Sequence, residues 1–197
     1  MSYRPICDTW ILARSKTKYY GAYPAGFLHR ATALLGVDVD AYVLHVCAGL
    51  VRNYPYRGLG PNHKTLDLNP LTKPDYLQDA REPFPEACFD GDHDKGCTRT
   101  GGLLHRAWDA VLIDRPYTED DADKYIPWGL GQGRGVLPPV NLLLRHGIAV
   151  VPVGGRVGIL DYLWPQPPKN AIEVAVIGVG TGRNSRARWF TVFERTA

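Results

Sequence analysis

The sequence lacks the features that membrane and secreted proteins need. No apolar run in its 197 residues reaches the roughly 18 residues of a membrane-spanning helix. The stretch 1–5 is not followed by the apolar segment of a secretory signal. Four cysteines are present, and their scatter does not suit a disulfide framework. We therefore expect a cytoplasmic protein with no membrane partner.

A glycine-rich dinucleotide fingerprint is also missing. The G-x-G-x-x-G pattern, which binds a pyrophosphate where a first strand turns into a helix, does not occur there. The turn at residues 48–50 holds one glycine, and the glycine-rich segment 178–182 lies near the other end of the chain and reads as a turn. NAD is therefore a disfavoured cofactor.

The composition is that of an ordinary globular domain. Hydrophobic residues make up 45% of the chain and charged residues 22%, so we expect one domain over residues 1–197. A formal net charge of +3 tolerates a nucleic-acid partner without demanding one. Arginines cluster near the C-terminus, either in solvated loops or at a nucleic-acid contact: Arg183, Arg186, Arg188 and Arg195.

Hydrophobic periodicity predicts strands interleaved with helices. Helical spacing covers residues 27–35 and ends at Gly36. Further helices are expected at 120–125 and 138–147, and strands at 42–47, 64–68, 75–79, 108–114 and 148–153, with a closing hairpin built from 173–179 and 189–194. This order indicates an α/β fold with a mostly parallel sheet and an antiparallel last strand. Residues 1–25, an arm or lid, and 81–107, an insert, show no period.

Candidate site residues follow the first strands of this pattern. Ligands of open α/β sheets bind beyond the carboxyl ends of the strands. Cys47, Ala48 and Gly49 form a small-residue turn that lets backbone approach a ligand. Asp67 is placed to accept hydrogen bonds from ribose hydroxyls, and Asp79 from an adenine amino group. Each aspartate has a structural alternative, a turn former for Asp67 and a helix cap for Asp79.

Residues 114–117 resemble motif IV of the amino-methyltransferases. Asp114-Arg115-Pro116-Tyr117 corresponds to the pattern Asp/Asn/Ser-Pro-Pro-Tyr/Phe after the fourth strand. The stretches 108–119 and 188–195 are similar to those of small phage and bacterial proteins related to DNA methylases. The resemblance implies a class I S-adenosylmethionine-dependent methyltransferase, with a Rossmann-like three-layer fold and a seven-stranded sheet.

The same resemblance implies roles for the motif. Asp114 would accept a hydrogen bond from the exocyclic amino group of a DNA base, Pro116 would shape the loop, and Tyr117 would stack on the extruded base. We add Arg115 to the substrate-binding set, together with Tyr20 and Tyr23 of the N-terminal arm. These two tyrosines belong either to a lid over the site or to an arm that packs on the core.

Two positions depart from the family pattern. Arg115 stands where the family has proline, and the segment 46–49 lacks the acidic residue and second glycine that are usual after the first strand. The alternatives to a DNA methyltransferase are therefore an enzyme of the same fold acting on a small molecule, and a non-catalytic binding or interaction protein that has kept the fold.

The insert holds a set of sulfur and imidazole groups. They are Cys88, His93, Cys97 and His105, and such ligands suit zinc. The interval between the two cysteines is not the short hook of a zinc finger. A zinc site, a disulfide between the cysteines and a loop without either remain open, and the loop is the preferred interpretation.

Overall fold

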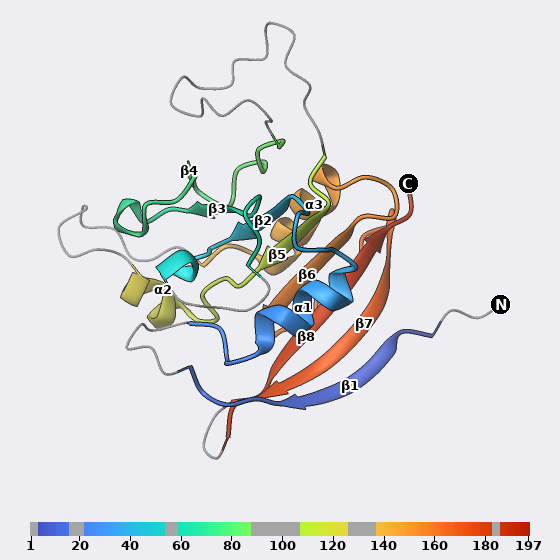
Figure 1. Cartoon of the computed structure of the whole chain (residues 1–197), viewed down its shortest axis with the longest axis horizontal. Coiled ribbons are helices and arrows are strands. Elements are labelled where there is room, and N and C mark those ends of the chain that lie inside the picture. The colour runs from blue at the N-terminus through green and yellow to red at the C-terminus, as the bar shows by residue number, and fades with distance from the viewer. Residues whose placement is uncertain (1–3, 16–21, 54–58, 88–106, 126–136, 183–185) are drawn as a thin grey trace, which may run out of the picture.

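The computed structural model describes residues 4–15, 22–53, 59–87, 107–125, 137–182 and 186–197. The strands form one eight-stranded sheet, and helices lie on both sides of it (Figure 1). In chain order the elements are β1 (Ile6–Ile11), α1 (Phe27–Leu35), β2 (Val43–Val46), η1 (Val51–Asn53), β3 (Lys64–Asp67), η2 (Pro70–Thr72), β4 (Tyr76–Leu77), β5 (Ala110–Ile113), α2 (Glu119–Tyr125), α3 (Val140–Val150), β6 (Arg156–Asp161), β7 (Ala171–Gly180) and β8 (Arg188–Arg195).

The strands lie in the order β1-β7-β8-β6-β5-β2-β3-β4. Strand β8 runs antiparallel to both of its neighbours, β6 and β7, and the other pairings are parallel. From β2 the chain moves outward through β3 to β4, and from β5 it moves the other way to β6. The strand order therefore reverses between β2 and β5, which is where open α/β sheets bind their ligands.

The expected mostly parallel sheet with an antiparallel last strand is confirmed, but it has eight strands rather than seven. The additional strand is β1, which pairs in parallel with β7 at the edge of the sheet. Of its six residues, Trp10 alone is buried. Because an edge strand exposed on both faces needs no alternation of apolar and polar residues, the sequence carried no strand signal there.

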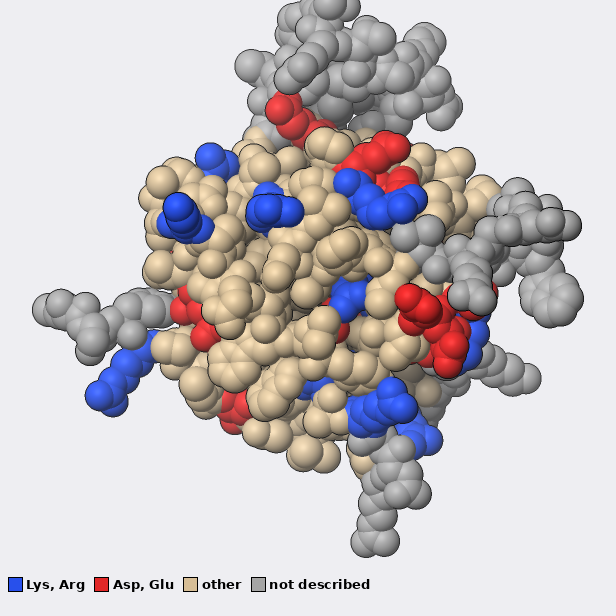
Figure 2. Space-filling view, turned by 180° about the vertical axis from the view of Figure 1, so that it is seen from behind, with Lys and Arg blue, Asp and Glu red and all other residues tan. Residues whose placement is uncertain are grey.

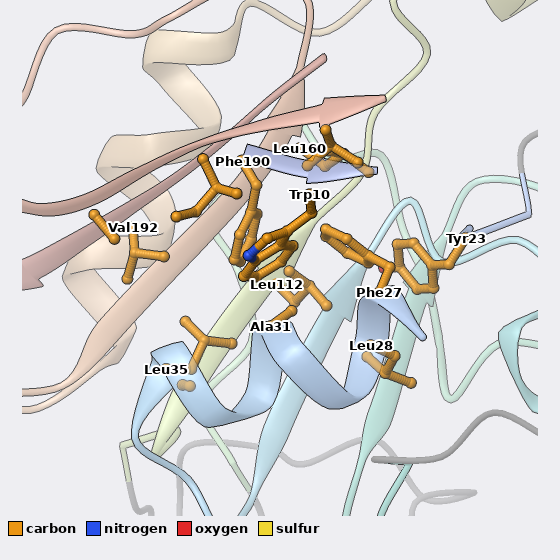
Figure 3. Packing of buried hydrophobic residues seen from close by; sticks show 14 of the residues in the cluster. Trp10, Tyr23, Phe27, Leu28, Ala31, Leu35, Leu112, Leu160, Phe190 and Val192 are labelled. Atoms are coloured by element: carbon orange, nitrogen blue, oxygen red, sulfur yellow. The ribbon is translucent and has the colours of Figure 1, made fainter. Parts of the chain in front are cut away.

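The core has one part on each face of the sheet. Helix α1 packs its apolar side against β5, β6, β7 and β8, with Phe27 beside Trp10 and Phe190 (Figure 3). Helix α3 covers the opposite face, where Leu143, Leu144 and Ile148 lie in the second cluster with residues of β2, β3, β5 and β6. Strands β2 and β5 are buried throughout, as expected for central strands covered on both faces.

The expected strand at 148–153 is wrong. Helix α3 continues to Val150 and stops before Pro152, and the strand that follows is β6 at Arg156–Asp161. The helix expected at 138–147 ends at Gly147. In the structure Gly147 lies inside α3, where a Cβ atom would come within 2.9 Å of a Val157 methyl group. This glycine therefore allows close contact between helix and strand instead of ending the helix.

The start of the insert is part of the core. Phe84 and Ala87 are buried in the second cluster, and the Pro85 carbonyl accepts a 2.7 Å hydrogen bond from the indole nitrogen of Trp108.

In the described part of the chain, no helix is both long and apolar enough to cross a membrane.

Candidate functional site

The turn after β2 is held in an unusual backbone conformation. Cys47 has φ 56° and Gly49 has φ 53°, and a non-glycine residue in the left-handed region is costly. The N–H groups of Cys47 and Ala48 both donate to the Leu66 carbonyl, at 2.9 and 3.4 Å. The turn is therefore drawn toward the end of β3.

Asp67, at the end of β3, ties that turn to the sheet. Its two carboxylate oxygens accept 2.8 Å hydrogen bonds from the backbone N–H groups of Gly49 and Asn69. Burial raises the pKa of this carboxyl, and the backbone hydrogen bonds oppose the rise. Each oxygen accepts one of these bonds and has a second lone pair, so the carboxylate is still able to accept from a ligand hydroxyl.

Asp79, two residues after β4, is engaged by its neighbour. Arg81 donates to both carboxylate oxygens from its guanidinium and to one from its backbone N–H. These bonds hold the pKa of Asp79 below its usual value. Arg81, which is exposed, thus competes for the same Asp79 oxygens that are predicted to accept from an adenine amino group. That contact stays a prediction.

Asp114 follows β5 and sits in a short hydrogen-bonded chain. The Tyr117 hydroxyl hydrogen-bonds to Asp114 Oδ1, and Arg188 Nη1 donates to the same hydroxyl at 3.0 Å. Burial raises the pKa of Asp114 to about 7, while the Arg188 cation and the Tyr117 hydrogen bond oppose the rise. A buried carboxyl with a pKa near neutrality, beside other polar and charged groups, is a candidate proton acceptor.

Arg115 is buried in an ion pair with Asp161. Its Nε donates to Asp161 Oδ2 at 2.6 Å and its Nη2 to Oδ1 at 3.3 Å. The two side chains are 3% and 0% exposed. We therefore replace the expected substrate contact with a structural role, in which Arg115 joins the end of β5 to the end of β6.

The tyrosine of the motif has an aromatic partner already. The rings of Tyr117 and Tyr162 lie 4.6 Å apart at 41°. The guanidinium of Arg188 lies 5.7 Å from the Tyr117 ring centre, and that of Arg186 lies 5.7 Å from the Tyr162 ring centre. Tyr117, which bonds to Asp114, thus belongs to a group of two tyrosines and two arginines.

The three predicted aspartates lie near the turn at Cys47. Burial is the main reason that the pKa of the Cys47 thiol is raised, and the charges of Asp67, Asp114 and Asp79 raise it further. Hydrogen bonds place two of these aspartates directly: the Gly49 N–H donates to Asp67 at 2.8 Å, and the Asp114 N–H donates to the Val46 carbonyl at 3.2 Å. The structure brings together the ends of these strands around the turn after β2.

The predicted contribution of the N-terminal arm is not supported where it is visible. Tyr23 is 3% exposed and stacks on Phe27 at 5.2 Å, so we assign it to the core instead of the substrate site. Tyr20 lies outside the described residues. The same holds for the possible zinc set: Cys88, His93, Cys97 and His105. Within the described ranges, no group of three or more candidate ligands is placed to hold a metal ion.

Sequence reasoning missed three residues of this region. Asp161 and Tyr162 were overlooked because the strand before them was misplaced. A usable signal was present, since the apolar run 157–160 ends in an aspartate just as the run 110–113 does. Arg188 belongs to the arginines that we expect either in solvated loops or at a nucleic-acid contact, yet it is partly buried against Tyr117. No local pattern distinguishes it from its neighbours.

The described surface shows no broad basic face on the side seen in Figure 2. Lysine and arginine side chains are scattered there, several of them beside acidic groups, and uncharged residues separate them. A nucleic acid on this side would meet little positive charge from the described residues.

The chain shares its architecture with solved methyltransferase structures. It is similar to an rRNA methylase from Streptococcus thermophilus with a TM-score of 0.50 and 11% identity, covering 89% of this chain and 100% of that one. It is also similar to TrmN from Thermus thermophilus, with a TM-score of 0.46 and 16% identity over 85% of this chain. The match spans about half of TrmN, 48% of its chain. No protein-family model matches the sequence, and no curated protein does.

The fold is thus the Rossmann-like methyltransferase fold. In this chain the antiparallel strand β8 lies between β6 and β7. At 11% identity the likeness to the rRNA methylase concerns the fold.

Proposed function

We propose that this chain is an S-adenosylmethionine-dependent methyltransferase whose acceptor is an exocyclic amino group of a nucleobase, with DNA as the first polymer to test. The observation that carries the proposal is the placement of Asp67, Asp79 and Asp114 at the carboxyl ends of β3, β4 and β5, at the point where the strand order reverses. Asp67 and Asp114 are also tied to the end of β2 and its turn by hydrogen bonds to Gly49 and Val46.

The residues present suit a cationic nucleoside. Carboxylates follow three neighbouring strands, and Asp67, which has no cation paired with it among the described residues, favours a ligand with positive charge and has acceptor capacity for ribose hydroxyls. A pyrophosphate would be repelled there, and residues 48–53 offer it no glycine-rich loop and only the three-residue η1. S-adenosylmethionine fits this description, and when bound it supplies an electrophilic methyl group on a sulfonium sulfur.

The turn at Cys47, Ala48 and Gly49 and the carboxylate of Asp67 would hold this cofactor. Gly49 is fixed by its hydrogen bond to Asp67, so the turn and the ribose acceptor form one unit. Asp79, next along the sheet, would accept from the adenine amino group if it exchanges one of its bonds to Arg81.

The acceptor side rests on Asp114. One of its oxygens bonds to Tyr117. Among the described residues no side chain donates to the other oxygen, which we assign to an N–H of the target amine. Accepting this bond aligns the nitrogen lone pair, and positioning is a large part of what a methyl transfer needs. With a pKa of about 7, Asp114 is also able to take the proton that the amine releases.

Calorimetric titration with S-adenosylmethionine and S-adenosylhomocysteine tests the cofactor half. Micromolar binding of both is expected, and no binding at millimolar ligand would contradict the proposal. A radiolabelled methyl donor with unmethylated DNA, RNA and free nucleosides then tests the acceptor half. Transfer to DNA at an amino nitrogen is expected, whereas transfer to another substrate alone would overturn the choice of DNA.

A further inference from the structure

We propose that Arg188 is a positioning residue of the acceptor site, which holds the Tyr117 hydroxyl as a donor to Asp114 and so reserves the other oxygen of Asp114 for the substrate. The inference rests on the proposed function because it takes Asp114 as the group that receives the acceptor.

The chemistry of the three groups sets the direction of the hydrogen bonds. An arginine carries only donors, and an ionised carboxylate carries only acceptors. The Tyr117 hydroxyl lies between them, 3.0 Å from Arg188 Nη1 and hydrogen-bonded to Asp114 Oδ1. It must accept from Arg188, and its single proton must go to Asp114. A hydroxyl that would otherwise rotate is therefore held in one orientation.

The direction of β8 brings Arg188 to this place. Because β8 is antiparallel to its neighbours, its first residues lie at the edge where the parallel strands end. Trp189 pairs with Asp161, the last residue of β6, and Arg188 pairs with Val179 near the end of β7. The arginine thus arrives at the carboxyl edge from a strand that begins there, 71 positions along the chain from Tyr117.

The charges around Asp114 make the cation of Arg188 important. Three groups act on its carboxyl: the Arg188 cation, the Tyr117 hydroxyl and the Asp161 carboxylate. Asp161 raises the pKa of Asp114, but Arg115 is paired with Asp161 and offsets its charge. Arg188 is therefore the main cation that favours the ionised form of Asp114, against burial.

Arg188 itself stays charged at this position. Burial works against its cation, but the neighbouring phenol of Tyr117 and the carboxylate of Asp114 raise its pKa above the usual value. The guanidinium also lies 5.7 Å from the centre of the Tyr117 ring, a distance at which a cation is attracted to the aromatic face. Ring and hydroxyl of Tyr117 are thus both restrained by the same side chain.

The test follows the titration of Asp114 directly. Carbon-13 NMR of carboxyl-labelled protein, with the resonance assigned by Asp114→Asn, reports the midpoint without any need for activity. Arg188→Met is expected to raise that midpoint by roughly 1 to 3 pH units, as for loss of a neighbouring opposite charge. Arg188→Lys, which keeps the charge, should restore most of the wild-type value.

A matched control is Arg30→Met, which removes an exposed arginine that lies over another aromatic ring, 5.6 Å from the centre of Trp10. It should leave the midpoint unchanged. If Arg188→Met does not fold, Tyr117→Phe removes the hydroxyl link while keeping the ring, and it should also raise the midpoint. An unchanged Asp114 midpoint in the folded variant overturns the proposal.

Kinetics separates this inference from the proposed function. If the wild type transfers methyl groups, Arg188→Met should move the acidic limb of its kcat/KM profile upward by the same number of pH units, with unchanged affinity for S-adenosylhomocysteine. A shifted NMR midpoint in a protein that binds no S-adenosylhomocysteine would leave the hydrogen-bonded chain standing and overturn the proposed function alone.

Discussion

Arg115 and Asp161 form a buried ion pair that joins the ends of two neighbouring parallel strands. Nε lies 2.6 Å from Oδ2, and neither side chain is more than 3% exposed. Asp161 also accepts the N–H of Leu163 at 2.9 Å. The motif IV of amino-methyltransferases has a proline where this chain has Arg115. In this chain the ion pair between Arg115 and Asp161 restrains the loop after β5, a role that the rigid proline ring has in the family pattern.

Asp161→Ala is expected to destabilise the protein by about 3 kcal/mol or more, because it leaves a buried guanidinium without its partner. Glu194→Ala is the matched control. It breaks the pair between Arg156 and Glu194, which also starts from β6 but is about one-third exposed, and it should cost roughly 1 kcal/mol or less. Urea denaturation at neutral pH measures both values, and equal losses would contradict the structural role of the pair.

Asp67→Ala should weaken S-adenosylhomocysteine binding roughly tenfold or more, since a charged acceptor for hydroxyl groups is lost. Asp114→Ala should change it little, because Asp114 is assigned to the acceptor. Asp8→Ala, at an exposed position on β1, is the control for a change of net charge. Calorimetry distinguishes these cases, and an equal loss in the first two variants would refute the division of roles.

Asp114→Asn should be more stabilising at pH 8 than at pH 4. The folded pKa of Asp114 is about 7 against an ordinary 3.8, so between these values the folded protein holds a proton that the unfolded chain has released. Stability is therefore lost as pH rises through this range, and an amide escapes the loss. Melting temperatures of variant and wild type across pH 4–8 measure the effect. A difference that does not change with pH would argue against the raised pKa.

A buried pair of histidines should make the protein sensitive to mild acid. His45 Nε2 and His63 Nδ1 lie 2.9 Å apart, and the side chains are 0% and 2% exposed. Burial, together with the nearby Arg52 cation, lowers the pKa of His63 from 6.5 to about 4. Below pH 6.5 the unfolded chain therefore binds more protons than the folded protein, and the free energy of unfolding decreases as the pH is lowered. From His63 alone the loss at pH 5, relative to neutral pH, is about 2 kcal/mol.

His63→Gln tests this account by removing one titrating group. Its free energy of unfolding should fall less than that of the wild type between pH 7 and pH 5, as measured by urea denaturation. His29→Gln, at an exposed position of α1, should retain the wild-type dependence. The explanation fails if His63→Gln and His29→Gln lose the same amount of stability.

The central strands were predictable from the sequence because they are apolar except at His45. Both faces are buried in the runs Ala110–Ile113 and Val43–Val46. A strand of this kind can be identified from its own residues, without knowing which strands it pairs with. Where a β-branched run ends a helix, as at Ile148–Val151, periodicity does not tell helix from strand. Helix α3 covers most of that run because its buried positions follow helical spacing from Val140 onward.

The candidate site was predictable as far as it depends on strand ends. Asp67, Asp79 and Asp114 each follow a strand, and the topology brings them together. The partners that decide what these residues do come from distant segments and carry no local signal. Asp161 takes up Arg115, and Arg188 acts on Tyr117, through contacts 46 and 71 positions apart.

Strand β8 carries an arginine at each end, and this makes its length a constraint on evolution. Arg195 donates to the carbonyls of Ile148, Ala149 and Val151 at 3.3, 3.3 and 2.7 Å, which closes the C-terminal end of α3. Arg188 lies at the opposite edge of the sheet, beside Tyr117. Inserting or deleting one residue between them would move one arginine by about 3.3 Å and turn its side chain to the other face. Changes of length in homologous chains should therefore fall outside residues 188–195.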